Sequence, residues 1–241
     1  LRSLVGSEMC IRDRYKVKVS IYSDCLILRC QHYVVFIFYL EIEYKLSYQY
    51  LKGESNVIRK AKTSDNRQIA ELCYLIWRDM ELDITKEITK DRIIEAIELS
   101  IVNVRYRSFY EHIWVYEKDG VVAGCVIAYP GKEEMDFEQQ WLKLPLEEDI
   151  LQLGTPLPEK ESYDDEIYIE AVVTTPKYRG QGIATQLLKY VISTHAHEKW
   201  GLNCDYDNNK ARHLYHKLGF KEDATIRLYG HQYFHMTLNN K

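Results

Sequence analysis

Several features that define other classes of protein are scarce in this sequence. The chain has no run of roughly 20 uninterrupted apolar residues, which a membrane helix needs, and its best candidate, residues 33–40, is too short. Proline accounts for only 5 of the 241 residues, and 46% are hydrophobic, so neither a disordered nor a fibrous protein is indicated. The N-terminus lacks the pattern of a secretory signal. We therefore expect a folded cytoplasmic protein with no membrane partner.

The charge balance, the cysteines and the histidines argue against nucleic-acid binding, disulfide bonds and a metal site, in that order. The formal net charge is −4 and the basic residues are scattered along the chain, so no nucleic-acid partner is expected. The six cysteines form no Cys-x-x-Cys pair, which favours buried free thiols in a reducing compartment. His195 and His197 have no carboxylate or cysteine at ligand spacing, so we predict no metal site.

The first part of the chain differs from the rest. Residues 1–14, LRSLVGSEMCIRDR, resemble the translation of a sequencing adapter. Residues 15–51 are rich in Tyr, Ile, Leu, Lys and Val and contain no proline or glycine, which is typical of AT-rich non-coding DNA read in frame. We predict that residues 1–56 are a poorly ordered, non-native leader and that the chain of a bacterial protein begins at Val57. A genuine N-terminal extension of the fold is the alternative.

From Val57 onward, hydrophobic spacing alternates between the periods of strands and helices. We expect strands at residues 57–61, 113–116, 121–128, 167–173 and 201–205 and a closing strand region at 226–237, with helices after Asp65 and over 88–102, 180–195 and 210–217. The Asp119-Gly120 pair predicts a hairpin turn. Residues 130–165 contain many acidic residues and read as a long, partly helical insertion anchored by Phe137, Trp141 and Leu142. These features predict one α/β domain over residues 57–241.

A glycine-bearing turn joins the strand at 167–173 to the next helix. Gly180 and Gly182 allow backbone N–H groups to approach an anion, and the start of the helix adds unpaired donors. A nucleotide-binding P-loop requires Lys after its last glycine, where this chain has Ile183. A dinucleotide motif requires Gly or Ala where this chain has Thr185. The turn therefore predicts a phosphate-binding site of another kind.

Two motifs resemble those of the GNAT family of N-acetyltransferases. The first is Arg or Gln, two residues, Gly, one residue, Gly or Ala, met by Arg179, Gly182 and Ala184. The second, Asn-x-x-Ala-x-x-Leu-Tyr-x-Lys-Leu-Gly-Phe, occupies residues 208–220. The resemblance covers residues 57–237 and implies the GNAT fold, a mixed, mostly antiparallel central sheet flanked by helices. It also implies transfer of an acetyl group from acetyl-coenzyme A to a primary amine in a ternary complex.

The resemblance further implies which residues bind coenzyme A. They are Val172, Val173, Thr174, Arg179, Gly180, Gln181, Gly182, Ile183, Ala184, Thr185, Asn208, Ala211 and Tyr215. The backbone of residues 172–174 would hold the pantetheine arm and polarise the thioester, and the loop would hold the pyrophosphate. Asn208 is also a natural helix N-cap, and the two roles are compatible.

Catalysis requires a group that deprotonates an alkyl ammonium of pKa about 10.4. Glu166 and Glu170 are the candidates, since alternation along a strand places both on one face with Tyr168. By resemblance, Glu166 lies where histone acetyltransferases of the family keep their base. The alternative for both carboxylates is a solvated acidic strand end. Tyr215 corresponds to the family's proton donor to the departing thiolate, and the alternative is a tyrosine that only packs.

The acceptor is less constrained by the sequence than the donor. The acidic residues of the insertion favour a cationic acceptor, such as a small-molecule amine, a polyamine, or the lysine or N-terminus of a peptide. Modification of ribosomal proteins or histones is a further reading, and the protein is expected to be a monomer or homodimer. A non-catalytic sensor or scaffold that binds acyl-coenzyme A is the alternative function.

Overall fold

The structure, a computed structural model, describes residues 56–239. These residues form a seven-stranded sheet in the order β1-β2-β3-β4-β5-β7-β6. The strands are β1 (Asn56–Lys60), β2 (Ile113–Lys118), β3 (Val121–Pro130), β4 (Ile167–Thr174), β5 (Lys199–Asp205), β6 (Lys221–Leu228) and β7 (His231–Asn239). Neighbouring strands are antiparallel, apart from β4 and β5, which are parallel. The expected mixed, mostly antiparallel sheet is confirmed.

The expected leader lies outside the described residues, apart from its last residue. Asn56 opens β1 and pairs with Lys118 of β2. The proposed start of the chain at Val57 therefore stays a prediction.

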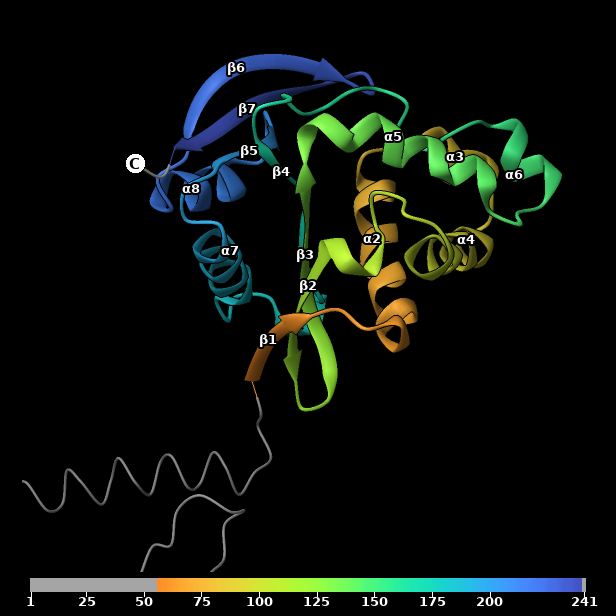
Figure 1. The fold of residues 1–241 in the computed structure, drawn as a ribbon, viewed down its shortest axis with the longest axis horizontal. Coiled ribbons are helices and arrows are strands. Elements are labelled where there is room, and N and C mark those ends of the chain that lie inside the picture. The colour runs from red at the N-terminus through yellow and green to blue at the C-terminus, as the bar shows by residue number, and fades with distance from the viewer. Residues whose placement is uncertain (1–55, 240–241) are drawn as a thin grey trace, which may run out of the picture. The chain divides into compact units, whose positions relative to one another are not determined.

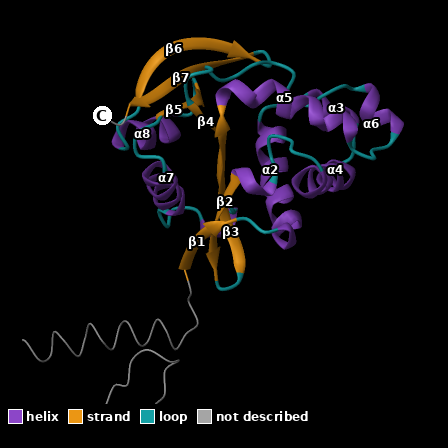
Figure 2. Ribbon diagram, viewed as in Figure 1, coloured by secondary structure: helices purple, strands orange, loops and turns teal. Residues whose placement is uncertain are grey.

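Helices cover both faces of the sheet (Figure 1). They are α2 (Asn66–Asp79), α3 (Asp83–Glu87), α4 (Lys90–Asn103), α5 (Glu134–Gln139), α6 (Glu148–Gln152), α7 (Ile183–Thr194) and α8 (Asn209–Lys217). Short 3-10 turns lie at Thr63–Asp65, Tyr110–His112, Gly131–Glu133, Gln140–Lys143 and Pro176–Tyr178. Helices α2 and α4 pack on one face, and α7 and α8 on the other, so the strands form the middle layer (Figure 2).

Each face of the sheet has its own hydrophobic core. On the α2 face, Ile69, Ile93 and Ile97 are fully buried, at the helical spacing that the sequence predicted. On the α7 face, Leu187 and Leu188 are equally buried and belong to the core that contains Trp200 of β5. Burying each of these aliphatic side chains contributes about 1.5–3 kcal/mol. The two cores therefore hold helices on both sides of the central strands.

Two tight turns connect antiparallel strands. Asp119 and Gly120, with φ of 53° and 77°, form the turn between β2 and β3 that the sequence predicted. The expected closing strand region at 226–237 proved to be two strands, joined where Tyr229 and Gly230 have φ of 50° and 84°. The first of them, β6, begins at Lys221 with three exposed polar residues, so its start carries no apolar signal.

Strand β4 is irregular where it matters for the site. Its register with β3 shifts, because Ile169 pairs with Ala128 while Ala171 pairs with the adjacent Ile127. Glu170 is the extra residue of this bulge. Strand β4 pairs with β5 only through residues 167–169, whereas it pairs with β3 as far as Thr174. The sheet is therefore open between β4 and β5 beyond Ile169.

Candidate active site

The glycine-bearing loop leads directly into α7. Gly180 and Gly182 have φ of 79° and 74°, which side-chain-bearing residues rarely adopt. The first backbone bond of the helix runs from the Gln186 N–H to the Gly182 carbonyl. Among the described residues, the N–H groups of residues 183–185 have no acceptor. The loop thus presents a helix N-terminus that can bind an anion.

A close approach between strands positions this loop. A Cβ atom at Gly124 of β3 would lie 2.7 Å from the Val173 carbonyl oxygen and 3.2 Å from Cγ2 of Ile183. Glycine therefore allows the first residue of α7 to pack directly against β3 and β4. Gly124 carries no such signal in the sequence, because a glycine inside an apolar strand does not by itself reveal what approaches it.

Basic side chains surround the loop. The Lys118 ammonium donates to the Gln181 side-chain oxygen at 3.1 Å. The Arg179 guanidinium donates to the Thr174 carbonyl at 3.3 Å and has no carboxylate partner within residues 56–239. Lys177 lies over the ring of Tyr178, 5.2 Å from its centre. These positive charges favour an anion at the start of α7.

The open side of β4 continues from the loop. Beyond Ile169, the backbone groups of residues 172–174 that point away from β3 have no strand partner in the described part of the chain. Such groups can donate to and accept from an extended ligand laid along the strand. The geometry is compatible with the predicted pantetheine contacts of Val172, Val173 and Thr174, which stay a prediction.

Helix α8 carries the second motif. The Asn208 side-chain oxygen accepts from the Ala211 N–H at 3.1 Å, so Asn208 is the helix N-cap. Tyr215 packs edge-on against Phe220, and its hydroxyl has no partner among the described residues. Burial raises the pKa of Tyr215 above its ordinary value, which keeps the phenol protonated. Cys204 is a buried free thiol, like Cys73 and Cys125, as expected.

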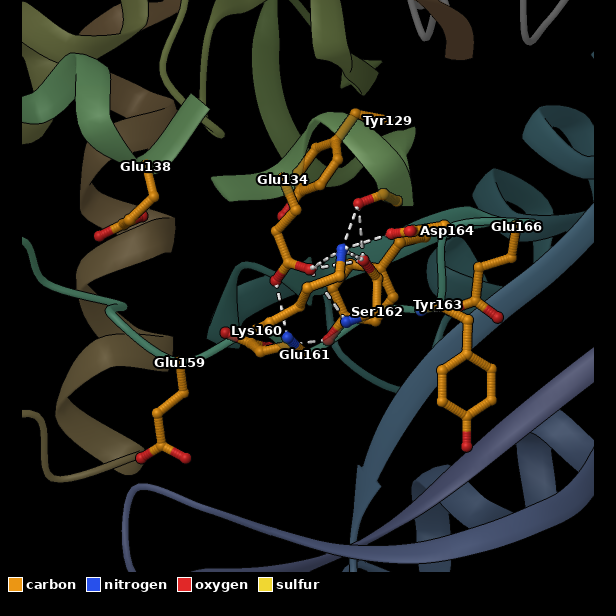
Figure 3. A network of polar contacts seen from close by, with 12 residues as sticks. Tyr129, Glu134, Glu138, Glu159, Lys160, Glu161, Ser162, Tyr163, Asp164 and Glu166 are labelled. Carbon is orange, nitrogen blue, oxygen red and sulfur yellow. Dashed lines mark hydrogen bonds and ion pairs between the residues drawn. The ribbon is translucent and has the colours of Figure 1, made fainter. Parts of the chain in front are cut away.

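The insertion at 130–165 is partly helical, as expected, and encloses a buried arginine. Phe137 and Trp141 are buried anchors, whereas Leu142 is 46% exposed, so its expected anchoring role is wrong. Arg107, between α4 and β2, is fully buried. Its guanidinium faces four carboxylates, those of Glu134 (2.8 Å), Glu138 (2.7 Å), Glu161 (3.2 Å) and Glu170 (3.8 Å). Three acidic residues of the insertion, Glu134, Glu138 and Glu161, therefore pair inside the protein. Figure 3 shows Glu134 beside Lys160 and Ser162.

Glu170 is buried at the bulge of β4. Its carboxylate accepts from the Tyr129 hydroxyl and lies at the edge of the Arg107 cluster. Burial raises the pKa of Glu170 to about 8, and the nearby guanidinium opposes this rise without cancelling it. The alternative of a solvated strand end is wrong for this residue, whose side chain is only 10% exposed.

Glu166 lies apart from this cluster, next to Tyr163 (Figure 3). Its carboxylate contacts Nε2 of His235 at 3.2 Å and accepts from the Tyr163 N–H at 3.0 Å. A Cβ atom at Gly201 would overlap this carboxylate at 2.1 Å, so Gly201 provides the space it occupies. Glu166 is 4% exposed and is therefore not a solvated strand end either. Glu170 lies within β4 and Glu166 directly before it, and the two candidate bases have separate surroundings.

A narrow pocket adjoins Glu170 on the α2 face. It is lined by Cys73, Ile76, Trp77, Met80, Ile127, Leu157, Glu161, Glu170 and Ala171, and its volume is about 20 Å³. The α7 loop belongs to the opposite face. The pocket and the loop therefore lie on the two sides of the opening between β4 and β5. Glu161 and Arg107 carry no signal for the site in the sequence, because neither lies in a recognisable motif.

No group of three or more His, Cys, Asp or Glu side chains within residues 56–239 is arranged to hold a metal ion. None of the helices described is long and apolar enough to cross a membrane.

Comparison with known proteins gives consistent matches. The model of the acetyltransferase (GNAT) family matches residues 69–220. An N-acetyltransferase from Staphylococcus aureus Mu50 is 49% identical, with a TM-score of 0.75 over 76% of this chain and 100% of that chain. Another solved structure, described as an acetyltransferase, is 30% identical, with a TM-score of 0.66 over 77% of this chain and 100% of that one. No curated protein gives a match.

A more distant match concerns the fold alone. A protein from Corynebacterium glutamicum, described as histone acetyltransferase HPA2 and related acetyltransferase, is 18% identical, with a TM-score of 0.56 over 78% of this chain and 97% of that chain. The family match over residues 69–220, the two more similar structures and the fold all agree. The chain belongs to the GNAT family of acetyltransferases.

Proposed function

We propose that the protein transfers an acetyl group from acetyl-coenzyme A to a primary amine, with Glu170 as general base and Tyr215 as general acid. The observation that carries the proposal is the position of Glu170. It is a buried carboxylate at the bulge of β4, where the sheet opens, and it lines a pocket on the face opposite the anion-binding loop. An amine in that pocket and a thioester along β4 would meet at the opening.

The donor would lie on the α7 face. Its pyrophosphate would bind the N–H groups of Gly180, Gln181, Gly182, Ile183, Ala184 and Thr185, with Arg179 and Lys118 nearby. Its pantetheine arm would follow residues 172–174, whose outward backbone groups have no strand partner in the described chain, although the Thr174 carbonyl accepts from Arg179. One of their N–H groups would stabilise the oxyanion of the tetrahedral intermediate. Asn208 and Ala211, at the start of α8, would contact the arm from the other side.

The raised pKa of Glu170 suits it to accept a proton from an ammonium ion. An alkyl ammonium has a pKa of about 10.4, so an ordinary glutamate of pKa 4.5 would be mismatched by about 6 pH units. With a pKa of about 8, the mismatch falls to about 2.4. At pH 7 only about a tenth of the molecules carry the ionised base, so turnover should rise with pH through 8.

The ammonium gives its first proton to Glu170, directly or through water, and the neutral amine attacks the thioester carbon. A carbon–nitrogen bond forms, and the carbon–sulfur bond breaks as the tetrahedral intermediate collapses. Tyr215, protonated over the working pH range, gives its proton to the departing thiolate. The second proton of the attacking nitrogen leaves as the amide forms and returns to Tyr215 through water, and Glu170 releases the first to solvent. No covalent enzyme intermediate is required, which agrees with the burial of Cys204.

Glu166 has a different place in this proposal. Its carboxylate contacts His235 and the Tyr163 N–H. It does not line the pocket beside Glu170. We assign Glu166 to holding β4 against β5 and β7, and Glu170 to proton removal.

Release of free thiol from acetyl-coenzyme A with a panel of primary amines tests the proposal. Glu170→Gln should lower kcat by about 10²–10⁴-fold, as expected for loss of a general base, and should leave coenzyme A affinity unchanged. Glu166→Gln is the matched control and should retain kcat if it folds. Coenzyme A binding without thiol release from any amine would instead support a sensor. Equal losses of kcat in both variants would contradict the assignment of Glu170.

A further inference from the structure

We propose that the acceptor is an unbranched alkyl amine that binds as its ammonium ion, and that Glu161 selects it. The inference rests on the proposed function, since it names the acceptor of the same reaction. It follows from the balance of charge around Arg107 and from the shape of the adjoining pocket.

The cluster around Arg107 contains more carboxylates than cations. Four glutamates face one guanidinium, and a second cation, the half-exposed ammonium of Lys160, lies 3.7 Å from Glu134. A surplus of buried negative charge is unstable unless protons or a bound cation compensate it. The cluster is therefore suited to receive another positive charge.

Two of the four carboxylates lie outside the pocket. Glu134 accepts from the N–H groups of Glu161 and Ser162 at 3.0 and 2.9 Å, in addition to Arg107. Glu138 accepts from the Leu157 N–H at 2.8 Å through Oε1, and its Oε2 lies 2.7 Å from Nε of Arg107 without a hydrogen bond. Neither of these two lines the pocket. Both pair with Arg107 away from the pocket.

The two other carboxylates line the pocket. Glu161 accepts from the hydroxyls of Tyr168 and Tyr229, both at 2.8 Å, and from the Arg107 guanidinium at 3.2 Å. Glu170 accepts from the hydroxyl of Tyr129 and lies 3.8 Å from the guanidinium. Burial raises the pKa of both Glu161 and Glu170. The pocket therefore ends at two of the four carboxylates of the cluster, and an ammonium bound there would favour their ionised forms.

The walls of the pocket determine which carbon chain the bound ammonium can carry. Helix α2 contributes Cys73, Ile76 and Trp77, and Met80 follows its last residue; all four are apolar and suit methylene groups. A volume of about 20 Å³ holds about one water molecule, so the acceptor must displace a wall. Met80 is half-exposed and unbranched and can move. A slender chain can enter in this way, whereas a ring or a branched carbon would push against the buried Trp77.

The two carboxylates have different tasks. Glu170, at the bulge and beside the opening to β5, removes the proton. Glu161 lies closer to Arg107 than Glu170 does, at 3.2 Å against 3.8 Å, and the guanidinium and the two hydroxyl donors oppose the effect of burial on its pKa. It holds the ammonium before proton transfer and repels an acceptor with a carboxylate next to its amine. Glu161 is therefore a binding residue whose loss should act on KM.

The test measures thiol release by the wild-type enzyme with each of four acceptors. They are n-butylamine, cyclohexylamine, 2-aminobutanoate and Nα-acetyl-lysine amide. We expect kcat/KM for n-butylamine to exceed that for cyclohexylamine and 2-aminobutanoate by at least about tenfold, the size of one lost charged contact. Nα-acetyl-lysine amide carries the same four-carbon stem, and its rate relative to n-butylamine distinguishes a peptide lysine from a free amine as the source.

Two variants test the role of Glu161. Glu161→Gln should raise KM for n-butylamine about tenfold and change kcat much less. Glu138→Gln removes a charge from the same cluster outside the pocket and should leave KM unchanged, and melting curves show whether each variant folds. Equal KM values for both variants, or turnover of 2-aminobutanoate as fast as n-butylamine, would overturn the inference. Thiol release with other amines but not with n-butylamine would overturn it and leave acetyl transfer standing, whereas no release with any amine would overturn both.

Discussion

The buried carboxylate of Glu170 should make the protein less stable as the pH rises. Its pKa is about 8 in the folded protein and near 4.5 when the chain is unfolded. Between these values the folded state holds a proton that the unfolded state has released. Because stability falls with pH wherever the folded state binds more protons, unfolding is favoured as the pH increases from about 4.5 to 8. Burial raises the pKa of Glu161 in the same direction.

The size of the effect follows from the rise in pKa. A pKa change from 4.5 to about 8 is worth up to about 5 kcal/mol, at about 1.4 kcal/mol per pH unit. We expect Glu170→Gln, which cannot ionise, to lose less stability than the wild type between pH 5 and pH 8.5.

Urea unfolding at several pH values provides the measurement. The difference in unfolding free energy between the wild type and Glu170→Gln should change by several kcal/mol over this range. Glu166→Gln serves as a comparison, since it removes a buried carboxylate directly before the same strand, at a site outside the cluster. Parallel stability curves for the wild type and Glu170→Gln would refute the reasoning.

Three further changes have defined expected outcomes. Gly182→Val places a β-branched side chain at φ of 74° and should weaken coenzyme A binding at least about tenfold by calorimetry, whereas unchanged affinity would contradict a role for the loop. Asn208→Ala removes the cap on the Ala211 N–H and should cost about 1 kcal/mol in urea unfolding, unless water replaces the cap fully. Gly201→Ala, whose Cβ would overlap the Glu166 carboxylate at 2.1 Å, should lower the melting temperature, and Glu166→Ala in the same chain should recover part of the loss.

Local patterns predicted much of the fold. The buried stripes of α2 and α4 and the turn at Asp119-Gly120 follow from spacing and turn chemistry that are visible in short windows. The start of β6 at Lys221 was missed, because an exposed edge strand carries polar residues with no alternation. Regular, half-buried elements are predictable because one side of each must be apolar.

The sequence predicted only those parts of the site whose chemistry requires a particular residue type within a short segment. The loop at Gly180 and Gly182 must adopt positive φ, and this requirement appears in the sequence as glycine. Strict alternation predicted that Glu166 and Glu170 belong together, but the bulge and the fold give them different partners. The pairing of Arg107 with glutamates 27 to 63 positions away depends on tertiary packing, which no local window contains.

The placement of the loop and the pocket on opposite faces has a kinetic consequence. If acetyl-coenzyme A arrives from the α7 face and the amine from the α2 face, each substrate can load while the other is bound. Spent coenzyme A would then compete with acetyl-coenzyme A for the loop but would not occlude the amine pocket. Product inhibition by coenzyme A should accordingly be competitive toward the donor and noncompetitive toward the amine, so a high amine concentration would not relieve it.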